Sequence, residues 1–213
     1  MEITAIEKRR KSLCAVYIDG EYALDLDKNV TLEHALFPGQ QITDEELYAL
    51  KSESDQRRAK EKALWLLSLQ DYSRKSLRDK LIKDYGEQAT ESTLERLEKL
   101  SLIDDERYAR AYAKDLFVIK KLSARAVKYK LIEKGIDRTL AQEITDEFDP
   151  DEEQQIYDLL NTKYIKNMFD EKGRCRTISA LQRMGYAYSV IRSAFDEFDA
   201  ENGYIKDDEY YES

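Results

Sequence analysis

Apolar and polar positions alternate along residues 3 to 26, and this alternation is typical of β-strands with one packed face. Leu13, Ala15 and Tyr17 fall on one face, and Val16 and Ile18 fall on the other. Asp19-Gly20 interrupts the alternation, and an Asp-Gly pair between two such runs indicates a two-residue hairpin turn. The sequence therefore predicts an antiparallel hairpin near the N-terminus.

The pattern becomes helical after this hairpin. A short helix is expected around Leu32 to Phe37, ending at Pro38-Gly39. Thr43 and Glu46 have the spacing of a capping box, which predicts a second helix start. We expect residues 1–55 to form a small β-containing extension that covers one end of a helical array, because repeat arrays need their apolar ends covered.

From about residue 58 the chain repeats itself with a period near 50 residues. Gly86, Gly135 and Gly185 mark the same turn in each copy, and Ser73 and Ser123 are placed to cap the helices before the first two of these turns. The predicted parts are three-helix repeats at 58–105, 106–150 and 151–199, followed by an acidic tail at 200–213.

The second helix of each repeat carries apolar residues about one turn apart, so one side of it must be buried. These pairs are Leu77 and Leu81, Val127 and Leu131, and Ile178 and Leu181. A lone three-helix unit of this size offers little core, which means that the copies should stack on one another. The predicted fold is mainly α: an elongated, curved array of three tandem three-helix repeats with a small N-terminal cap that contains a β-hairpin.

Charge is unevenly distributed along the chain. The net charge of −9 argues against a simple nucleic-acid-binding domain, because such domains usually carry a basic excess. Residues 57–83 nevertheless contain nine Lys and Arg against three Asp and Glu, and residues 107–134 contain nine against two. Acidic blocks follow at 143–153 and 196–213, so an acidic chain carries local basic segments.

Candidate chemistry is sparse. His34 is the only histidine, lies near Leu32, Leu36 and Phe37, and is expected to be structural or exposed. Cys14 and Cys175 lack the spacing of a zinc site or a disulfide framework. No nucleotide-binding, protease or hydrolase motif occurs. We therefore expect no catalytic residues, no metal, no cofactor and no enzymatic activity. No apolar run is long enough for a membrane span or a signal sequence, so a cytoplasmic protein is expected.

The aromatic residues are mostly expected in the core. Trp65 lies among leucines, and Tyr108 and Tyr112 are one helical turn apart, which favours packing over stacking on nucleobases. Tyr72 and Tyr129 are flanked by basic residues and are the candidates for a surface role.

Three neighbouring segments carry a recognisable pattern. QDYSRKSLRDKLIKDYG and KKLSARAVKYKLIEKG form basic second helices, and LEKLSLIDDERYARAYAKDL joins them. Within these segments, Tyr72-Ser73-Arg74 and the stretch 97–109 resemble the pattern of the RecX family, and the resemblance covers about residues 58–199. The third copy matches less closely, and the N-terminal extension is not shared by every member.

This resemblance implies a regulator of homologous recombination and DNA repair. Such a regulator binds the RecA–DNA filament and suppresses its ATP turnover, strand exchange or growth. The basic second helices could meet carboxylates of the protein or phosphates of the DNA. The residues predicted to bind the partner are Arg74, Lys75, Arg78, Lys120, Lys121, Arg125, Lys128 and Lys130.

Two other functions fit the same pattern. Three-helix units with a serine-capped basic helix also describe a helix-turn-helix transcription regulator, and a helical adaptor for a different protein would differ only in its partner. For the filament regulator we expect a monomer that binds single-stranded or duplex DNA only weakly and does not bind membranes.

Overall fold

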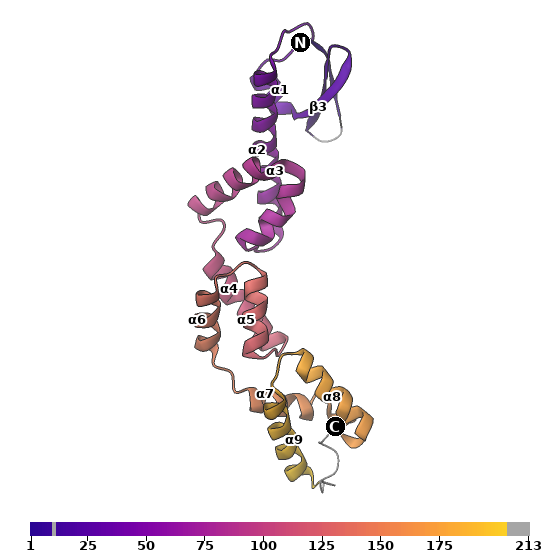
Figure 1. Cartoon of the computed structure of the whole chain (residues 1–213), viewed down its shortest axis with the longest axis vertical. Helices are drawn as coiled ribbons and strands as arrows, with labels where there is room; N and C mark the ends of the chain where they lie inside the picture. The colour runs from indigo at the N-terminus through magenta and orange to yellow at the C-terminus, as the bar shows by residue number, and fades with distance from the viewer. Residues whose placement is uncertain (10–11, 204–213) are drawn as a thin grey trace. The chain divides into compact units, whose positions relative to one another are not determined.

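The N-terminal strands form a three-stranded antiparallel sheet in the order β1 (Ile3–Lys8), β2 (Leu13–Ile18) and β3 (Glu21–Asp27). Asp19 and Gly20 join β2 to β3 with φ angles of 50° and 89°, the left-handed backbone that tight hairpins use. The predicted hairpin is confirmed. The computed structural model describes residues 1–9 and 12–203, and the chain divides into two compact units after Asp105 (Figure 1).

Helix α1 (Lys28–Glu33) begins and ends earlier than predicted. Its start is set by Asp27, whose side chain accepts the Asn29 N–H at 2.8 Å and caps the helix. Its end is set by Ala35, whose φ of 48° is incompatible with a helix. The predicted helix over residues 32–37 is therefore wrong in its bounds.

Helix α2 (Asp44–Leu69) begins at the predicted capping box. The Thr43 side chain accepts the Glu46 N–H at 3.2 Å, and the Glu46 carboxylate accepts the Thr43 N–H at 2.9 Å. The first part of α2 buries Leu50 against the sheet residues Val16 and Leu26. The helix then continues without a break across residues 55–58 into the first repeat (Figure 1).

Repeat 1 is completed by α3 (Arg74–Lys99), which is two helices separated by Gly86. Gly86 has φ 73° and ψ 176°, values that only glycine adopts readily. Ser73 caps α3 as predicted, and Leu77, Leu81 and Leu94 form the core with the end of α2. Trp65 is not part of this core: it is 53% exposed, and Lys62 Nζ lies 4.4 Å from its ring centroid. The prediction for Trp65 is wrong because its ring lies on the outer side of α2.

In the second unit, α4 (Asp105–Lys114) continues as a π-helical turn, η1 (Asp115–Ile119), before α5 (Ala124–Glu133) and α6 (Arg138–Phe148). Ser123 caps α5 as predicted. Val127 and Leu131 are fully buried with residues of the flanking helices, so the predicted apolar stripe of this repeat is confirmed.

Repeat 3 consists of α7 (Glu152–Asn161), the 3₁₀ turn η2 (Ile165–Phe169), α8 (Glu171–Arg183) and α9 (Tyr188–Asn202). Its second helix buries Thr177 and Leu181, whereas Ile178 is half-buried, which corrects the predicted stripe by one residue. Phe195 and Phe198 of α9 complete this core. The part of the predicted acidic tail after Gly203 lies outside the described residues.

The architecture is thus mainly helical with a small N-terminal sheet, as predicted. Within the described ranges, none of the helices combines the length and the apolar character that crossing a membrane would require.

Candidate partner-binding surface

Arg74 and Arg78 lie one turn apart in α3 and are bound by glutamates that follow Gly86. Arg74 Nη2 donates to Glu91 Oε2 at 2.7 Å, and its Nε lies 2.8 Å from Glu98 Oε1. Arg78 Nε donates to the other Glu91 oxygen at 2.6 Å, and its Nη2 donates to Glu87. These arginines and glutamates form one ion-pair network within repeat 1.

This network shifts the ionisation of its members. Hydrogen bonds from Arg78 and then from Arg74 hold the pKa of Glu91 below its ordinary value. The hydrogen bond to Glu91 raises the pKa of each arginine. The charges of Arg74 and Arg78 are therefore largely compensated inside their own repeat.

Corresponding positions of the three second helices are 50 residues apart, as the buried leucines Leu81, Leu131 and Leu181 show. By this spacing Ala124 takes the place of Arg74, and Lys128 takes the place of Arg78. Repeat 2 therefore has a basic residue at only one of these two positions, Lys128.

Lys128 is hydrogen-bonded to a neutral side chain. Lys128 Nζ donates to Gln142 Oε1 on α6, and the Gln142 amide donates onward to Asp146 at 2.5 Å. In repeat 1 the corresponding contact joins Arg78 to a carboxylate, that of Glu91. Among the described residues, no acid therefore forms an ion pair with Lys128.

The outward side of α5 is also more cationic than that of α3. Arg125 and Tyr129 are one turn apart there, both are exposed, and Tyr129 is 64% exposed. The corresponding residues of α3 are Lys75 and Asp79, which carry opposite charges. The acid on the outer side of α3 is thus replaced by an uncharged aromatic residue on α5.

The loop before α5 adds two further lysines. Lys120 is exposed, whereas Lys121 is half-buried with a φ of 53°. Lys130 lies on the opposite edge of α5 from Lys128, because two residues turn an α-helix by about 200°. Among the residues that the structure describes, no acidic side chain forms an ion pair with Lys120, Lys121, Arg125 or Lys130.

Seven of the eight predicted contact residues fall into two chemically different groups, and the eighth, Lys75, lies on the outward side of α3. Those of α5 and its loop project an excess of positive charge, whereas Arg74 and Arg78 are held by neighbouring carboxylates. The glutamates that bind Arg74 and Arg78 were not predicted from the sequence. Glu91 and Glu98 are seven residues apart and so share a helix face, but the direction of that face depends on the turn at Gly86.

The start of α3 and the start of α5 are each held by an acidic side chain from later in the sequence. The backbone N–H of Arg74 donates to Asp105 Oδ1 at 2.7 Å, and the N–H of Ala124 donates to Glu152 Oε1 at 2.7 Å. Burial raises the pKa of the Asp105 carboxyl, although the bond from the Arg74 backbone opposes this shift. These acids supply acceptors for helix N–H groups that have no partner within the helix.

In the second unit, repeat 3 packs directly on the start of α5. The N–H of Ser123 donates to the Met184 carbonyl at 3.1 Å. The hydroxyl of Tyr186 lies 2.8 Å from the carbonyl oxygen of Lys121 and 2.6 Å from Gln155 Oε1. Hydrogen bonds with repeat 3 therefore hold the loop that carries Lys120 and Lys121.

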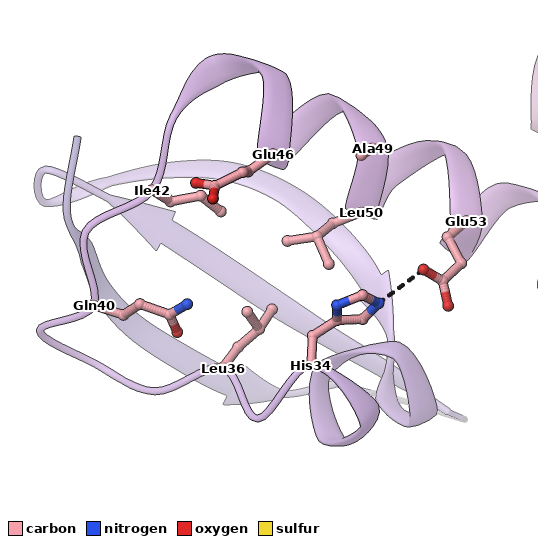
Figure 2. A pocket seen from close by; sticks show the side chains of 8 residues that line it. All are labelled: His34, Leu36, Gln40, Ile42, Glu46, Ala49, Leu50 and Glu53. Carbon is pink, nitrogen blue, oxygen red and sulfur yellow. Dashed lines mark hydrogen bonds and ion pairs between the residues drawn. The ribbon is translucent and has the colours of Figure 1, made fainter.

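A pocket in the N-terminal part lies between α1 and the start of α2 (Figure 2). His34 Nε2 and Glu53 Oε2 are 2.8 Å apart at its edge, and both side chains are exposed to solvent. Leu36, Ile42 and Leu50 form its apolar wall. The other polar side chains of the pocket are bound to backbone N–H groups: Gln40 Oε1 accepts from Phe37 at 3.3 Å, and Glu46 accepts from Thr43. The exposed His–Glu pair therefore gives no arrangement for acid–base chemistry. Within residues 1–9 and 12–203, no group of His, Cys, Asp or Glu could hold a metal ion.

Models of known families match both central repeats. The model described as RecX, first three-helix domain, matches residues 59–97, and the model described as RecX, second three-helix domain, matches residues 104–144.

Individual relatives extend the match over most of the chain. The regulatory protein RecX of Clostridium acetobutylicum is 30% identical over 210 residues, which cover 94% of this chain and 97% of that protein. The regulatory protein RecX of Clostridium beijerinckii is 30% identical over 166 residues, which cover 76% of this chain and 77% of the relative. Both relatives are named as regulatory proteins.

Solved structures show the same fold. A crystal structure of regulatory protein RecX aligns with a TM-score of 0.60 at 23% identity and covers 92% of this chain and 98% of its own. RecX from Lactobacillus salivarius aligns with a TM-score of 0.57 at 24% identity, covering 68% of this chain and 97% of its own. The two relatives at 30% identity, in agreement with the two matching domain models, show that the chain belongs to the RecX family.

Proposed function

We propose that this chain binds the RecA–DNA filament and inhibits its ATPase activity, strand exchange and growth. Two observations support the proposal: the chain belongs to a family whose members are named regulatory proteins, and α5 with its leading loop forms a cationic surface. The second observation carries the proposal, because it names a surface on which binding can be tested.

A nucleoprotein filament offers two anions that such a surface can bind. Carboxylates of the protein and phosphates of the DNA both accept charge-assisted hydrogen bonds from Lys and Arg. The α5 residues retain this capacity, since no described acid forms an ion pair with Arg125. Arg74 and Arg78 must first give up their glutamates, so we assign them a smaller part in binding.

The acidity of the whole chain favours the filament over bare DNA. At a net charge of −9, the chain as a whole is repelled by phosphate, while the local basic surface attracts it over short distances. A filament supplies protein surface in addition to phosphate, so binding there does not depend on counterion release alone. We therefore propose weak, salt-sensitive binding to free DNA and tighter binding to the filament.

We further propose that the chain acts as a cytoplasmic, non-enzymatic monomer without a cofactor. Its parts are the extension at 1–55, the repeats at 58–105, 106–150 and 151–199, and the tail at 200–213.

The DNA-dependent ATPase activity of RecA, titrated with this chain, tests the function. We expect the rate to fall progressively as the chain is added, whereas a flat response would remove the assignment. Fluorescence anisotropy of the labelled chain with free single-stranded DNA, random duplex and filament gives the order of affinities. Tightest binding to the duplex would indicate a DNA-binding transcription regulator instead.

A further inference from the structure

The residue that ends the helical segment before each second helix is apolar and exposed. Leu69 ends α2, Ile119 ends η1 and Phe169 ends η2. Their exposed fractions are 62%, 68% and 66%, and they are spaced 50 residues apart. Each stands four residues before the position of Ser73, Ser123 or Gly173 at the start of the second helix.

These side chains are not needed for the cores of their repeats. The apolar contacts at the end of each first segment come from earlier residues, namely Leu66, Phe117 and Met168, which are buried. A polar residue at position 69, 119 or 169 would leave those contacts unchanged and would suit an exposed position better. Single exposed apolar residues are common on protein surfaces, but these three share equivalent positions in their repeats and have similar exposure.

The residue types indicate what the three positions bind. Leucine, isoleucine and phenylalanine share apolar volume but no hydrogen-bonding group. Stacking on nucleobases requires an aromatic ring, which only Phe169 has. A small apolar pocket in a protein surface accepts all three side chains, and such anchors contribute much of the binding energy of protein interfaces.

The basic residues near Ile119 and Phe169 indicate that the complementary pocket on the partner has an acidic rim. Lys120 and Lys121 directly follow Ile119, and Arg125 begins the helix after it. Lys166 and Lys172 flank Phe169, although Asp170 and Glu171 offset them. The positive charge is therefore most one-sided around Ile119, and we expect Ile119 to be the strongest of the three anchors.

We propose that Leu69, Ile119 and Phe169 are equivalent anchors that insert into the same acid-rimmed apolar pocket on successive identical subunits of a protein polymer. A polymer is the partner for which three equal anchors are useful, because it presents the same pocket repeatedly. This inference rests on the proposed binding to a filament and names the contact that each repeat makes there.

The test measures binding of the full labelled chain to the RecA–DNA filament by fluorescence anisotropy. The variant Leu69→Ser/Ile119→Ser/Phe169→Ser removes all three anchors. The matched control Leu32→Ser/Phe37→Ser/Leu100→Ser removes two leucines and a phenylalanine that are 64%, 58% and 56% exposed at unrelated positions. Circular dichroism verifies that both variants fold, and Ile119→Leu/Phe169→Leu tests whether apolar volume alone is sufficient.

We expect affinity to fall at least ~30-fold for the anchor variant, less than ~3-fold for the control and less than ~3-fold for the leucine variant. Equal affinities for the anchor variant and the wild type would contradict the role of the three anchors. Binding of the wild-type chain to the filament would still support the proposed function. A similar loss in the control would also contradict the role of the anchors, because the effect would then be general surface hydrophobicity. If the wild-type chain does not bind the filament, the proposed function fails and the anchors fail with it.

Discussion

Gly185 packs directly against Ser123. A Cβ atom added to Gly185 would lie 2.3 Å from Ser123 Oγ and 2.5 Å from Ala126 Cβ, and the φ of Gly185 is 97°. Ser123 Oγ already accepts the Ala126 N–H at 3.2 Å, so it cannot move away without releasing the cap of α5. This contact fixes repeat 3 to the start of the helix that carries the candidate surface.

Replacing Gly185 by alanine should therefore destabilise the second unit. We expect Gly185→Ala to lower the free energy of unfolding by about 2–4 kcal/mol, since it combines backbone strain with a steric clash. Chemical denaturation followed by circular dichroism measures the change. Gly203→Ala is the control, because Gly203 also has a positive φ, of 71°, but a Cβ added there would meet no described residue within 4 Å. It should cost about 1 kcal/mol, and equal losses would show that the contact with Ser123 contributes nothing.

The hydroxyl of Tyr186 should contribute to the same junction. Burial raises the pKa of this phenol, so it stays protonated and able to donate throughout the neutral range. Tyr186→Phe leaves the Lys121 carbonyl without this donor, and we expect a loss of about 1–2 kcal/mol in the free energy of unfolding. Tyr188→Phe, at an exposed position in α9, should change the stability by less than about 0.5 kcal/mol. A loss no greater for Tyr186→Phe than for Tyr188→Phe would contradict this role.

The ion-pair network of repeat 1 should make folding sensitive to acid. The pKa of Glu91 is lower in the folded chain than in the unfolded chain, where it is near ~4.3. The stabilisation is therefore complete above that unfolded value and is lost as the pH falls through the lower folded value. Unfolding measured between pH 6 and pH 3 should show a smaller drop in stability for Glu91→Gln than for the wild type. Parallel curves for the two proteins would mean that the network does not stabilise the fold.

One substitution should give repeat 2 the charge compensation that is present in repeat 1. Gln142→Glu should place a carboxylate beside Lys128, as Glu91 is placed beside Arg78. We expect about 3- to 10-fold weaker inhibition of the RecA ATPase, because the charge on α5 is then compensated within the repeat. The control Gln182→Glu adds the same charge at an exposed position of α8 and should change inhibition less than ~2-fold. Equal effects of the two substitutions would indicate that only the overall charge matters.

Local sequence signals predicted much of the fold. The Asp19-Gly20 turn, the capping box at Thr43, the serine cap at Ser123 and the glycine turn at Gly185 each depend on a few neighbouring residues, and each is present in the structure. A backbone hydrogen bond or a positive φ is set locally, so residue type and spacing are sufficient to identify it.

Features that depend on distant contacts were not predictable in the same way. Trp65 was expected in the core because its neighbours are leucines, but which side of a long helix is covered depends on where α3 packs. The pairing of Arg78 with Glu91 likewise depends on the direction in which the chain leaves Gly86. The basic residues of the candidate site were visible in the sequence, whereas the acids that neutralise some of them were not.

The most direct test of a filament-binding surface on α5 is charge reversal within it. Arg125→Glu/Lys128→Glu should raise the concentration of chain needed for half-maximal inhibition of the RecA ATPase by at least ~10-fold, with an unchanged circular dichroism spectrum. Lys8→Glu/Lys28→Glu makes the same change of net charge at exposed positions of the N-terminal part and should leave that concentration within ~2-fold of the wild type. Undiminished inhibition by the α5 variant, or an equal loss in both variants, would contradict the assignment of this surface.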